Sequence, residues 1–226
     1  MIRLFCGYDE REAIGFHVFV HSVLEHASQP VQIVPLAARG MPQGSNAFTY
    51  SRFLVPYLCD YKGHAIFVDA SDMLMLADVA ELDALFDPQY AVQCVQHPTY
   101  KTRHPIKYRG TSMQCPNRDY ARKNWASVML LNCEHPYWHA IDPKSLELVA
   151  SVALLKLGGL RADGKEGPRE IGALPDKWNR IVDEGQPVDG AAVLHYTAGI
   201  PAFHSYRDTP GAEHWLRTAD RMVELP

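Results

Sequence analysis

The sequence predicts an α/β fold, a single domain built on a mainly parallel central sheet. Apolar runs at 2–6 and 31–35 flank a helical stretch, which is the order of a parallel βαβ unit. Further apolar runs alternate with helical stretches along the chain. The 226 residues suffice for one large domain covering 1–226, and no internal repeat or long linker divides them.

An apolar run and the residues that end it predict the first strand and the first helix. Residues 2–6 end at Gly7 and read as a buried strand. Asp9 and Glu12 have the spacing of a capping box, so we expect a helix from there to about residue 27. Residues 31–35 form the second strand. The expected core face of the helix comprises Ile14, Val18, Val20, Val23 and Leu24.

The middle of the chain alternates between strands and helices. Residues 37–48 are rich in Gly, Pro, Ser and Asn and predict a loop. The following pattern predicts helices at 50–59 and 79–86 and strands at 64–68 and 90–95.

Residues 97–124 are polar, irregular and basic. This segment reads either as a solvated loop or as a lid or substrate-facing surface. Its basic residues are Lys101, Arg103, Lys107, Arg109, Arg118, Arg122 and Lys123.

The last third is expected to be mostly irregular. A strand is predicted at 128–132, a helix at 143–157 with Pro143 in its first turn, and a short strand at 192–196. Glycines and charges at 158–170 predict a mobile loop, and another loop covers 197–201.

Composition narrows the class of protein. Hydrophobic residues make up 47% and charged residues 21%, as in globular proteins with a buried core. The net charge of −4 argues against a nucleic-acid partner. Five cysteines without a Cys-x-x-Cys pair predict free thiols in a reducing compartment. Without a signal peptide or an apolar run long enough for a transmembrane segment, the expected localisation is cytoplasmic, and peripheral membrane association stays open.

The segment AIFVDASDMLML places two carboxylates after a buried strand. Ligands bind at the carboxyl ends of strands in open α/β sheets, and carboxylates there suit a divalent metal that bridges phosphate oxygens. Residues two apart share a face of a strand, but Asp69 and Asp72 are three apart. They converge only if the chain bulges after Asp69; otherwise Ser71 or a water replaces one ligand, or the pair merely caps a turn.

Six segments, in order, resemble the GT-A glycosyltransferases related to glycosyltransferase family 8. The resemblance is to a bacterial group that opens with a Gly-Tyr-Asp-x-Arg-Glu motif. The segments are GYDEREA at 7–13, FTYSRFLVPYL at 48–58, FVDASDML at 67–74, NWASVMLLNC at 124–133, LPDKWN at 174–179 and LHYTAGIPAF at 194–203.

The resemblance implies a role for several residues. Tyr8 and Asp9 correspond to residues that hold the base and ribose of a nucleotide, although Asp9 alone also reads as a helix cap. Arg52 corresponds to an arginine near the donor sugar or diphosphate; without the resemblance, a surface salt bridge is equally good. A planar guanidinium suits phosphate recognition.

Asp69 and Asp72 correspond to the family's Asp-x-Asp, with one residue more between them. Either both serve around a bulge, or Asp72 alone is retained with Ala70 in the other place. His195 corresponds to the histidine that completes the metal site, and an imidazole ligand favours Mn²⁺ over Mg²⁺.

Other correspondences are looser. Residues 124–127, with Trp125 and Ser127, correspond to a segment near the donor sugar, and Trp125 reads equally well as core. Trp178 and Asn179 correspond to donor- or acceptor-side residues. Glu170 and Asp176 are candidates for the residue near the reacting carbon.

The resemblance therefore implies a metal-dependent glycosyltransferase with Arg52 and Asp72 in the reaction. The donor would be a nucleotide-sugar, a UDP-sugar, and the acceptor a hydroxyl of a glycan or lipid, with retention of configuration. The alternatives are a non-catalytic nucleotide-sugar-binding protein and another metal-dependent enzyme, a nucleotidyltransferase or phosphatase. The sugar, the linkage and the oligomeric state are not specified by the sequence.

Overall fold

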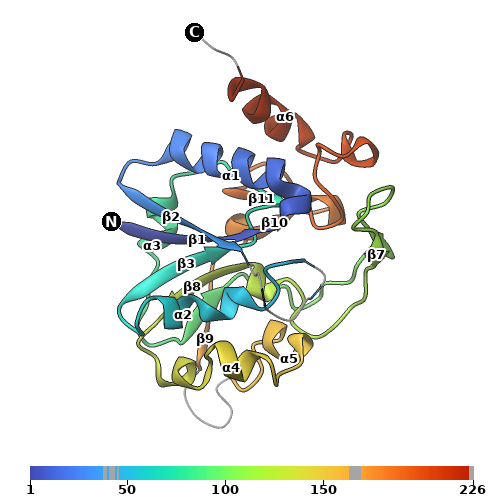
Figure 1. Cartoon of the computed structure of the whole chain (residues 1–226). Coiled ribbons are helices and arrows are strands. Elements are labelled where there is room, and N and C mark those ends of the chain that lie inside the picture. Colours follow the sequence, from blue (N-terminus) through green and yellow to red (C-terminus); the bar gives the residue numbers. More distant parts are fainter. Residues whose placement is uncertain (38–39, 41–43, 45, 163–168, 224–226) are drawn as a thin grey trace.

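The computed structural model describes residues 1–37, 40, 44, 46–162 and 169–223 and is built on a six-stranded sheet (Figure 1). The strands, in spatial order, are β2 (Val31–Ala37), β1 (Ile2–Tyr8), β3 (His64–Val68), β8 (Val128–Asn132), β5 (Val92–Cys94) and β9 (Ile171–Ala173). The pairs β1–β2, β1–β3 and β5–β9 are parallel, and β8 runs antiparallel to both of its neighbours. The predicted mainly parallel α/β sheet is confirmed.

A second, smaller sheet lies beside the main one; the sequence predicted one of its strands, at 192–196, but not the sheet. It has the order β10 (Arg180–Ile181), β11 (Val193–His195) and β4 (Met73–Met75), and β6 (Ile106–Lys107) pairs separately with β7 (Cys115–Pro116). Strands of two or three residues are too short to show alternation in the sequence. β4 and β11 are antiparallel, with Met73 opposite His195, so this sheet joins two of the predicted site segments.

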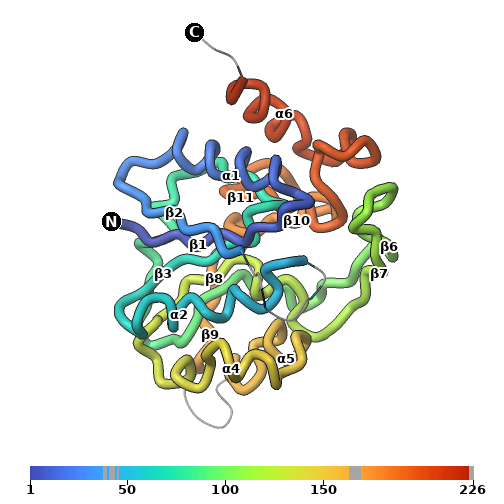
Figure 2. The backbone as a smooth tube through the Cα atoms, viewed as in Figure 1, coloured from blue at the N-terminus to red at the C-terminus, as the bar shows by residue number. Residues whose placement is uncertain are grey.

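Helices cover both faces of the main sheet (Figure 1). One face carries α1 (Ala13–His26), and α6 (Ala212–Arg221) packs on its outer side (Figure 2). The other face carries α2 (Val55–Leu58), α4 (Pro143–Leu146) and α5 (Ser151–Leu155). Helix α3 (Val79–Asp83) follows β4. No helix among the described residues is long and apolar enough to cross a membrane.

The predicted core face of α1 was partly wrong. Val18 and Val23 are fully buried, but Ile14 and Leu24 are 48% and 57% exposed. The buried stripe also includes Phe16 and Phe19, whose burial is favourable because of their large apolar area. The helix also begins later than predicted, after a 3₁₀ turn at Glu10–Glu12.

The predicted helix over 143–157 is two short helices. A capping box between Asp142 and Ser145 starts α4, and the chain leaves helical geometry before α5, where Ala150 is extended. Leu148, between them, is 88% exposed and offers no burial to hold a continuous helix. The last third is less irregular than predicted, because it contains β9, β10 and α6.

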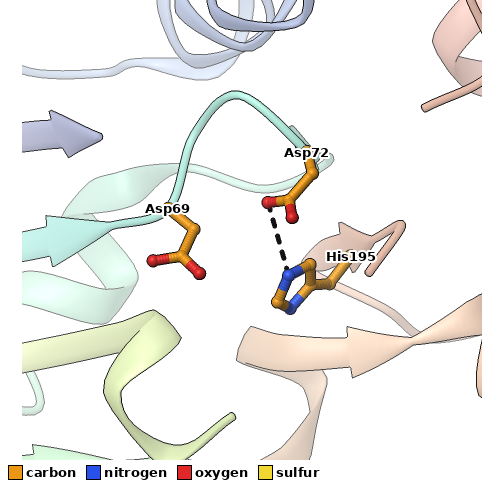
Figure 3. A group of neighbouring side chains, drawn as sticks. All are labelled: Asp69, Asp72 and His195. Atoms are coloured by element: carbon orange, nitrogen blue, oxygen red, sulfur yellow. Dashed lines mark ion pairs between the residues drawn. The ribbon is translucent and has the colours of Figure 1, made fainter. Parts of the chain in front are cut away.

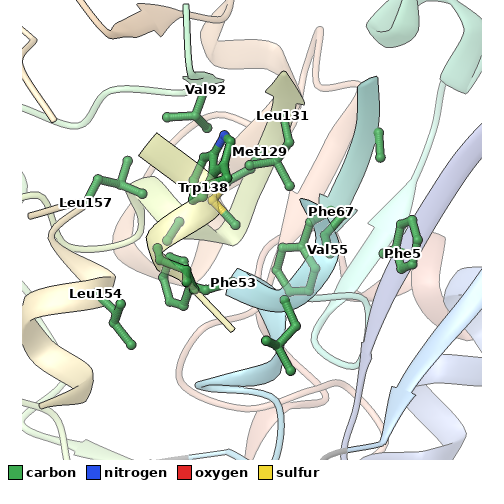
Figure 4. Packing of buried hydrophobic residues seen from close by; sticks show 14 of the residues in the cluster. Phe5, Phe53, Val55, Phe67, Val92, Met129, Leu131, Trp138, Leu154 and Leu157 are labelled. Atoms are coloured by element: carbon green, nitrogen blue, oxygen red, sulfur yellow. The ribbon is translucent and has the colours of Figure 1, made fainter. Parts of the chain in front are cut away.

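The described residues form three apolar clusters, and the two larger ones lie on opposite sides of the main sheet. Because side chains alternate along a strand, Phe67 of β3 faces α2 and α5 while Ile66 and Val68 face α1. Figure 4 shows the first core, where Phe53, Trp138 and Leu154 pack beneath the sheet. All five cysteines are free, as predicted.

Two predicted loops are described only in part. The loop at 37–48 includes residues 38, 39, 41–43 and 45, and the loop at 158–170 includes 163–168, all of which lie outside the described residues.

Candidate functional site

The chain makes a tight turn between β3 and β4, and this turn carries the two aspartates. The Ser71 N–H donates to the Asp69 carbonyl at 2.6 Å, and the Met73 N–H donates to the Ala70 carbonyl at 3.0 Å. Ala70 takes the left-handed conformation, with φ +55°. The extra residue is thus absorbed in a bulge, and Asp69 and Asp72 turn their side chains toward the same space (Figure 3).

Close packing against α1 holds this turn in place. The Ser71 hydroxyl donates to the Gly7 carbonyl at 3.2 Å. The Ser71 carbonyl lies so near Gly15 that an added Cβ would approach it to 1.9 Å. A side chain at Gly15 would therefore displace either the helix or the turn.

His195 reaches the same space from β11 (Figure 3). Its Nε2 lies 3.3 Å from Oδ1 of Asp72, and its Nδ1 lies 2.8 Å from Oδ1 of Asn179. Since the Asn179 oxygen only accepts, it fixes the proton on Nδ1 of the neutral ring and leaves the Nε2 lone pair directed at the aspartates. One ligand atom from each of Asp69, Asp72 and His195 lies within 4.8 Å of the others.

This group of residues fits a divalent metal. Two carboxylates and one imidazole suit Mn²⁺, or Mg²⁺ with more oxygen ligands. Oδ1 of Asp69 and Oδ1 of Asp72 are buried and have ion-pair contacts, with Arg52 and His195 respectively, but no well-aligned hydrogen bond among the described residues. Ligands of one such ion are at most about 4.2 Å apart, twice the metal–ligand distance, so small side-chain rotations would close the site.

The charges of the three groups are coupled. Burial raises the pKa of Asp69 to about 6, although Arg52 opposes that shift. Burial also acts to raise the pKa of Asp72, but His195 outweighs it and the pKa is lowered. For His195, burial favours the neutral ring, while Asp72 and Asp69 raise the pKa above its ordinary value. Without metal, Asp72 and His195 therefore form a buried ion pair.

Arg52 is buried, so the alternative prediction of a surface salt bridge is wrong. It lies in the 3₁₀ turn Ser51–Leu54 and is 3% exposed. One guanidinium nitrogen lies 2.7 Å from Oδ1 of Asp69 and donates to the Ala126 carbonyl at 2.8 Å. The rings of Phe48 and Phe67 lie beside the same guanidinium. Arg52 thus holds Asp69 by a buried ion pair.

Tyr8 and Asp9 stand at the carboxyl end of β1. The Asp9 carboxylate accepts hydrogen bonds from the Arg11 side chain at 2.6 and 2.9 Å, from the Arg11 N–H at 3.0 Å and from the Ala47 N–H at 2.9 Å. Burial acts to raise the pKa of Asp9, but these hydrogen bonds outweigh burial, and the net effect is a lowered pKa. The helix-cap reading is correct, with Arg11 as the capped residue. Tyr8 is half-buried, edge-on to Phe16.

Of the residues assigned to the sugar side, the two tryptophans pack in the core, and their neighbours Ser127 and Asn179 contact the site. Trp125 and Trp178 are buried in the two apolar cores. The Ser127 carbonyl accepts from the Asp69 N–H at 2.9 Å. Asn179 holds His195, as described above. Ser127 and Asn179 therefore contact the metal-site residues directly, whereas the tryptophans pack beneath them.

Glu170 lies outside the site. It precedes β9, an edge strand that is separated from β3 by β8 and β5. It pairs with Arg161 at 3.2 Å. The carboxylate of Asp176 is 68% exposed and pairs with Arg180 at 3.0 Å. Neither carboxylate is brought to the group formed by Asp69, Asp72 and His195.

Sequence reasoning missed two residues beside the acidic centre. Glu12 is 1% exposed, and neither of its carboxylate oxygens has a hydrogen-bond partner in the described chain. Burial and the nearby Asp72 charge hold its pKa well above the usual range. Tyr108 is completely buried, and burial together with Glu12, Asp72 and Asp69 raises its pKa. The sequence assigned Glu12 to a capping box with Asp9, and the structure shows that this was wrong, because the Glu12 carboxylate accepts no hydrogen bond from the described residues. Nothing in the basic segment distinguishes Tyr108.

Part of the 97–124 segment is therefore not a solvated loop. The Tyr108 N–H donates to the Ala198 carbonyl at 2.6 Å, which fastens the segment to the loop after His195. Lys107 lies near enough to interact electrostatically with Asp72 and Glu12.

Solved structures with the same fold are glycosyltransferases. The bifunctional glycosyltransferase WbbM matches with a TM-score of 0.64 and 13% identity over 96% of this chain and 49% of its own. The galactosyltransferase LgtC, solved with donor and acceptor sugar analogs, matches with a TM-score of 0.64 and 15% identity over 100% of this chain and 98% of its own. GlyE from Streptococcus pneumoniae matches with a TM-score of 0.60 and 14% identity over 96% of this chain and 60% of its own. The chain thus spans under two thirds of WbbM and GlyE, and it has the predicted GT-A fold.

A closer relationship exists at the level of sequence. No protein-family model matches the chain. The Arabidopsis thaliana protein named Protein CDI is 36% identical over 231 aligned positions, which cover 95% of this chain and 84% of that protein. At this identity and coverage, the chain belongs to the same family as Protein CDI.

Proposed function

We propose that this protein is a metal-dependent glycosyltransferase that moves a sugar from a nucleotide-sugar, a UDP-sugar, to an acceptor hydroxyl. The observation that carries the proposal is the buried group of Asp69, Asp72 and His195 at the carboxyl end of β3. The GT-A fold supports it, because the solved structures that share this fold are glycosyltransferases.

Asp69, Asp72 and His195 would hold Mn²⁺ or Mg²⁺ in this proposal. The ion, when bound, supplies Lewis-acid stabilisation of the charge that develops on a leaving nucleoside diphosphate. Asn179 keeps the His195 ring in the tautomer that a metal requires. Arg52 orients Asp69 and adds a fixed positive charge at the same place.

Tyr8 and Asp9 are proposed to line the nucleotide end of the site, because β1 ends beside β3 in the sheet. The Asp9 side chain already accepts hydrogen bonds from Arg11 and Ala47, so it would act mainly by shaping the backbone there. Ser127 and Asn179 would lie toward the sugar, with Trp125 and Trp178 packed behind them.

We further propose retention of anomeric configuration, a glycan or lipid acceptor, a cytoplasmic location and kinship with glycosyltransferase family 8. These rest on the resemblance of the six sequence segments. Peripheral membrane association of the protein is compatible with a lipid acceptor.

The first test is a thermal-stability titration with UDP, with Mn²⁺ and with both. A ligand that binds only the folded protein stabilises it by about 2.7 kcal/mol at a hundredfold excess over its Kd. The expected shift requires UDP and Mn²⁺ together and disappears in Asp72→Ala but not in Asp176→Ala, the exposed aspartate. The absence of a shift with any nucleotide–metal pair would overturn the proposal.

Turnover decides between an enzyme and a binding protein. Release of UDP from a panel of UDP-sugars, with and without hydroxyl acceptors, should be catalysed by the wild type and abolished in Asp72→Ala. Binding without any UDP release across the panel would favour the non-catalytic alternative.

A further inference from the structure

A cavity of about 350 Å³ opens beside Asp69, and Asp72 and His195 are not among its lining residues. Its walls come from the 3₁₀ turn before α2, the 107–127 part of the basic segment and α5. Arg52 and Asp69 both line it, so the cavity borders the proposed metal site. Whatever occupies it would lie next to the reacting atoms.

The charge lining this cavity is strongly unbalanced. Its charged residues are Arg52, Lys107, Arg118, Lys123 and Asp69. The single acid, Asp69, is already paired with Arg52 at 2.7 Å. Beyond the pair of Arg52 and Asp69, the described walls therefore carry three cations and no further acid.

Lys123 is the most informative of these cations. It is 7% exposed, and its ammonium donates to Oδ1 of Asn117 at 2.6 Å and to the Arg118 carbonyl at 3.0 Å. Its only ion pair among the described residues is a long one of 3.8 Å, to the partly exposed Asp119. Burial, and then the charge of Lys107, lower the pKa of Lys123. Asp119 and Glu184 act in the opposite direction, but the two lysines still repel each other beside the cavity, and a bound anion would relieve that repulsion.

The remaining walls suit a small polyhydroxylated molecule. They supply hydroxyl and amide groups that can donate to and accept from sugar hydroxyls. These groups belong to Thr49, Asn117, Tyr120, Asn124, Ser127 and Ser151.

We propose that this cavity binds an anionic sugar or polyol, whose carboxylate or phosphate is recognised by Lys107, Arg118 and Lys123. The anion belongs either to the transferred sugar, as a uronic acid, or to the acceptor, as a phosphorylated alcohol. The inference rests on the proposed function, since it assigns a substrate class to the same site. It concerns a charge additional to the donor diphosphate.

Matched ligand pairs test this inference in the presence of Mn²⁺. Calorimetry compares UDP-glucuronate with UDP-glucose, which differ in one carboxylate, and glucose 6-phosphate with glucose in protein saturated with UDP. The anionic member of one pair should bind at least about tenfold more tightly, as expected for a charge-assisted contact. The pair that shows the preference identifies the anion's source.

Substitutions test which residues cause the preference for the anionic ligand. Arg118→Gln changes an exposed residue, and Lys123→Gln a buried one; each should reduce the preference about tenfold while leaving the Kd of UDP unchanged. Lys101→Gln, an exposed lysine of the same segment that does not line the cavity, should change neither value.

The outcomes separate the two proposals. No binding of UDP with Mn²⁺ overturns the proposed function, and free glucuronate and glucose 6-phosphate then test the cavity directly by the same substitutions. Equal affinities within both pairs overturn the cavity proposal. The cavity proposal is also overturned if Arg118→Gln and Lys123→Gln lose as much affinity for UDP as for the anionic sugar. These cations would then bind the diphosphate.

Discussion

Nε2 of His195 lies 3.3 Å from Oδ1 of Asp72, and both side chains are almost completely buried. In the metal-free protein the two groups neutralise each other, because each moves the other's pKa toward the charged form. A metal would need the imidazole deprotonated. Metal binding and the ion pair therefore compete for the same histidine nitrogen.

Opposite pH dependences should follow from this competition. The pKa of His195 is raised from 6.5, so the pair stabilises the metal-free fold fully below 6.5, and this contribution is lost as pH rises through the folded-state value. At the acid end, the contribution of Asp72 is lost as pH falls through its lowered pKa. Mn²⁺ affinity should instead rise with pH from 6 to 8. Calorimetry for the metal and denaturant unfolding in EDTA measure the two trends, and His195→Asn should abolish both.

The hydrogen bond from His195 Nδ1 to Asn179 predicts a specific effect on metal affinity. Asn179→Ala removes the acceptor that fixes the tautomer, so Mn²⁺ affinity should fall about 10–100-fold. The control is Asn132→Ala, another buried asparagine, whose side chain donates to the Pro88 carbonyl. Both variants should lose stability, but only Asn179→Ala should lose metal affinity. Equal metal affinities in the two variants would contradict the orienting role.

Arg52 should be needed for stability only while Asp69 is charged. Arg52→Met leaves a buried carboxylate without its cation, and we expect a loss of about 3–5 kcal/mol in the free energy of unfolding. Adding Asp69→Asn to Arg52→Met should restore most of that loss, but not UDP–Mn²⁺ binding. A double variant as unstable as Arg52→Met alone would show that the contacts of Arg52 with Phe48 and Phe67, rather than its charge, stabilise the fold.

Gly15 should couple helix packing to the site. A Cβ there meets the Ser71 carbonyl at 1.9 Å, so Gly15→Ala should push α1 from the 69–72 turn and destabilise the protein by about 1–3 kcal/mol. Mn²⁺ affinity should fall with it, because that turn carries both aspartates. Ile14→Ala, at an exposed position of the same helix, serves as the comparison and should change the free energy of unfolding by less than about 1 kcal/mol.

Glu12 should destabilise the metal-free protein at neutral pH. Its pKa is raised from 4.5 by burial and by Asp72, so the unfolded chain loses this proton first and stability falls as pH rises above 4.5. Glu12→Gln should therefore be more stable than wild type at pH 7, by about 1–3 kcal/mol, and equal to it near pH 4. Urea unfolding in EDTA at both pH values measures this; a less stable variant at pH 7 would contradict the prediction.

The sequence by itself determined the sheet and the location of its ligand edge. The apolar runs that form β1, β2, β3 and β8 are long enough to show burial, and the order strand–helix–strand leaves few topologies. Because ligands collect at the carboxyl ends of such strands, Asp69 and Asp72 could be assigned to the site before their geometry was known.

Only the tertiary structure decided how the side chains meet. The bulge at Ala70 depends on backbone conformation, and the pairing of β4 with β11 joins segments more than a hundred residues apart. The contact of Asn179 with His195 joins two separate elements 16 residues apart. Glu12 and Tyr108 reach the acidic centre for the same reason. Local patterns carry propensity and periodicity, whereas convergence of distant side chains is set by packing, which has no signature in a single sequence.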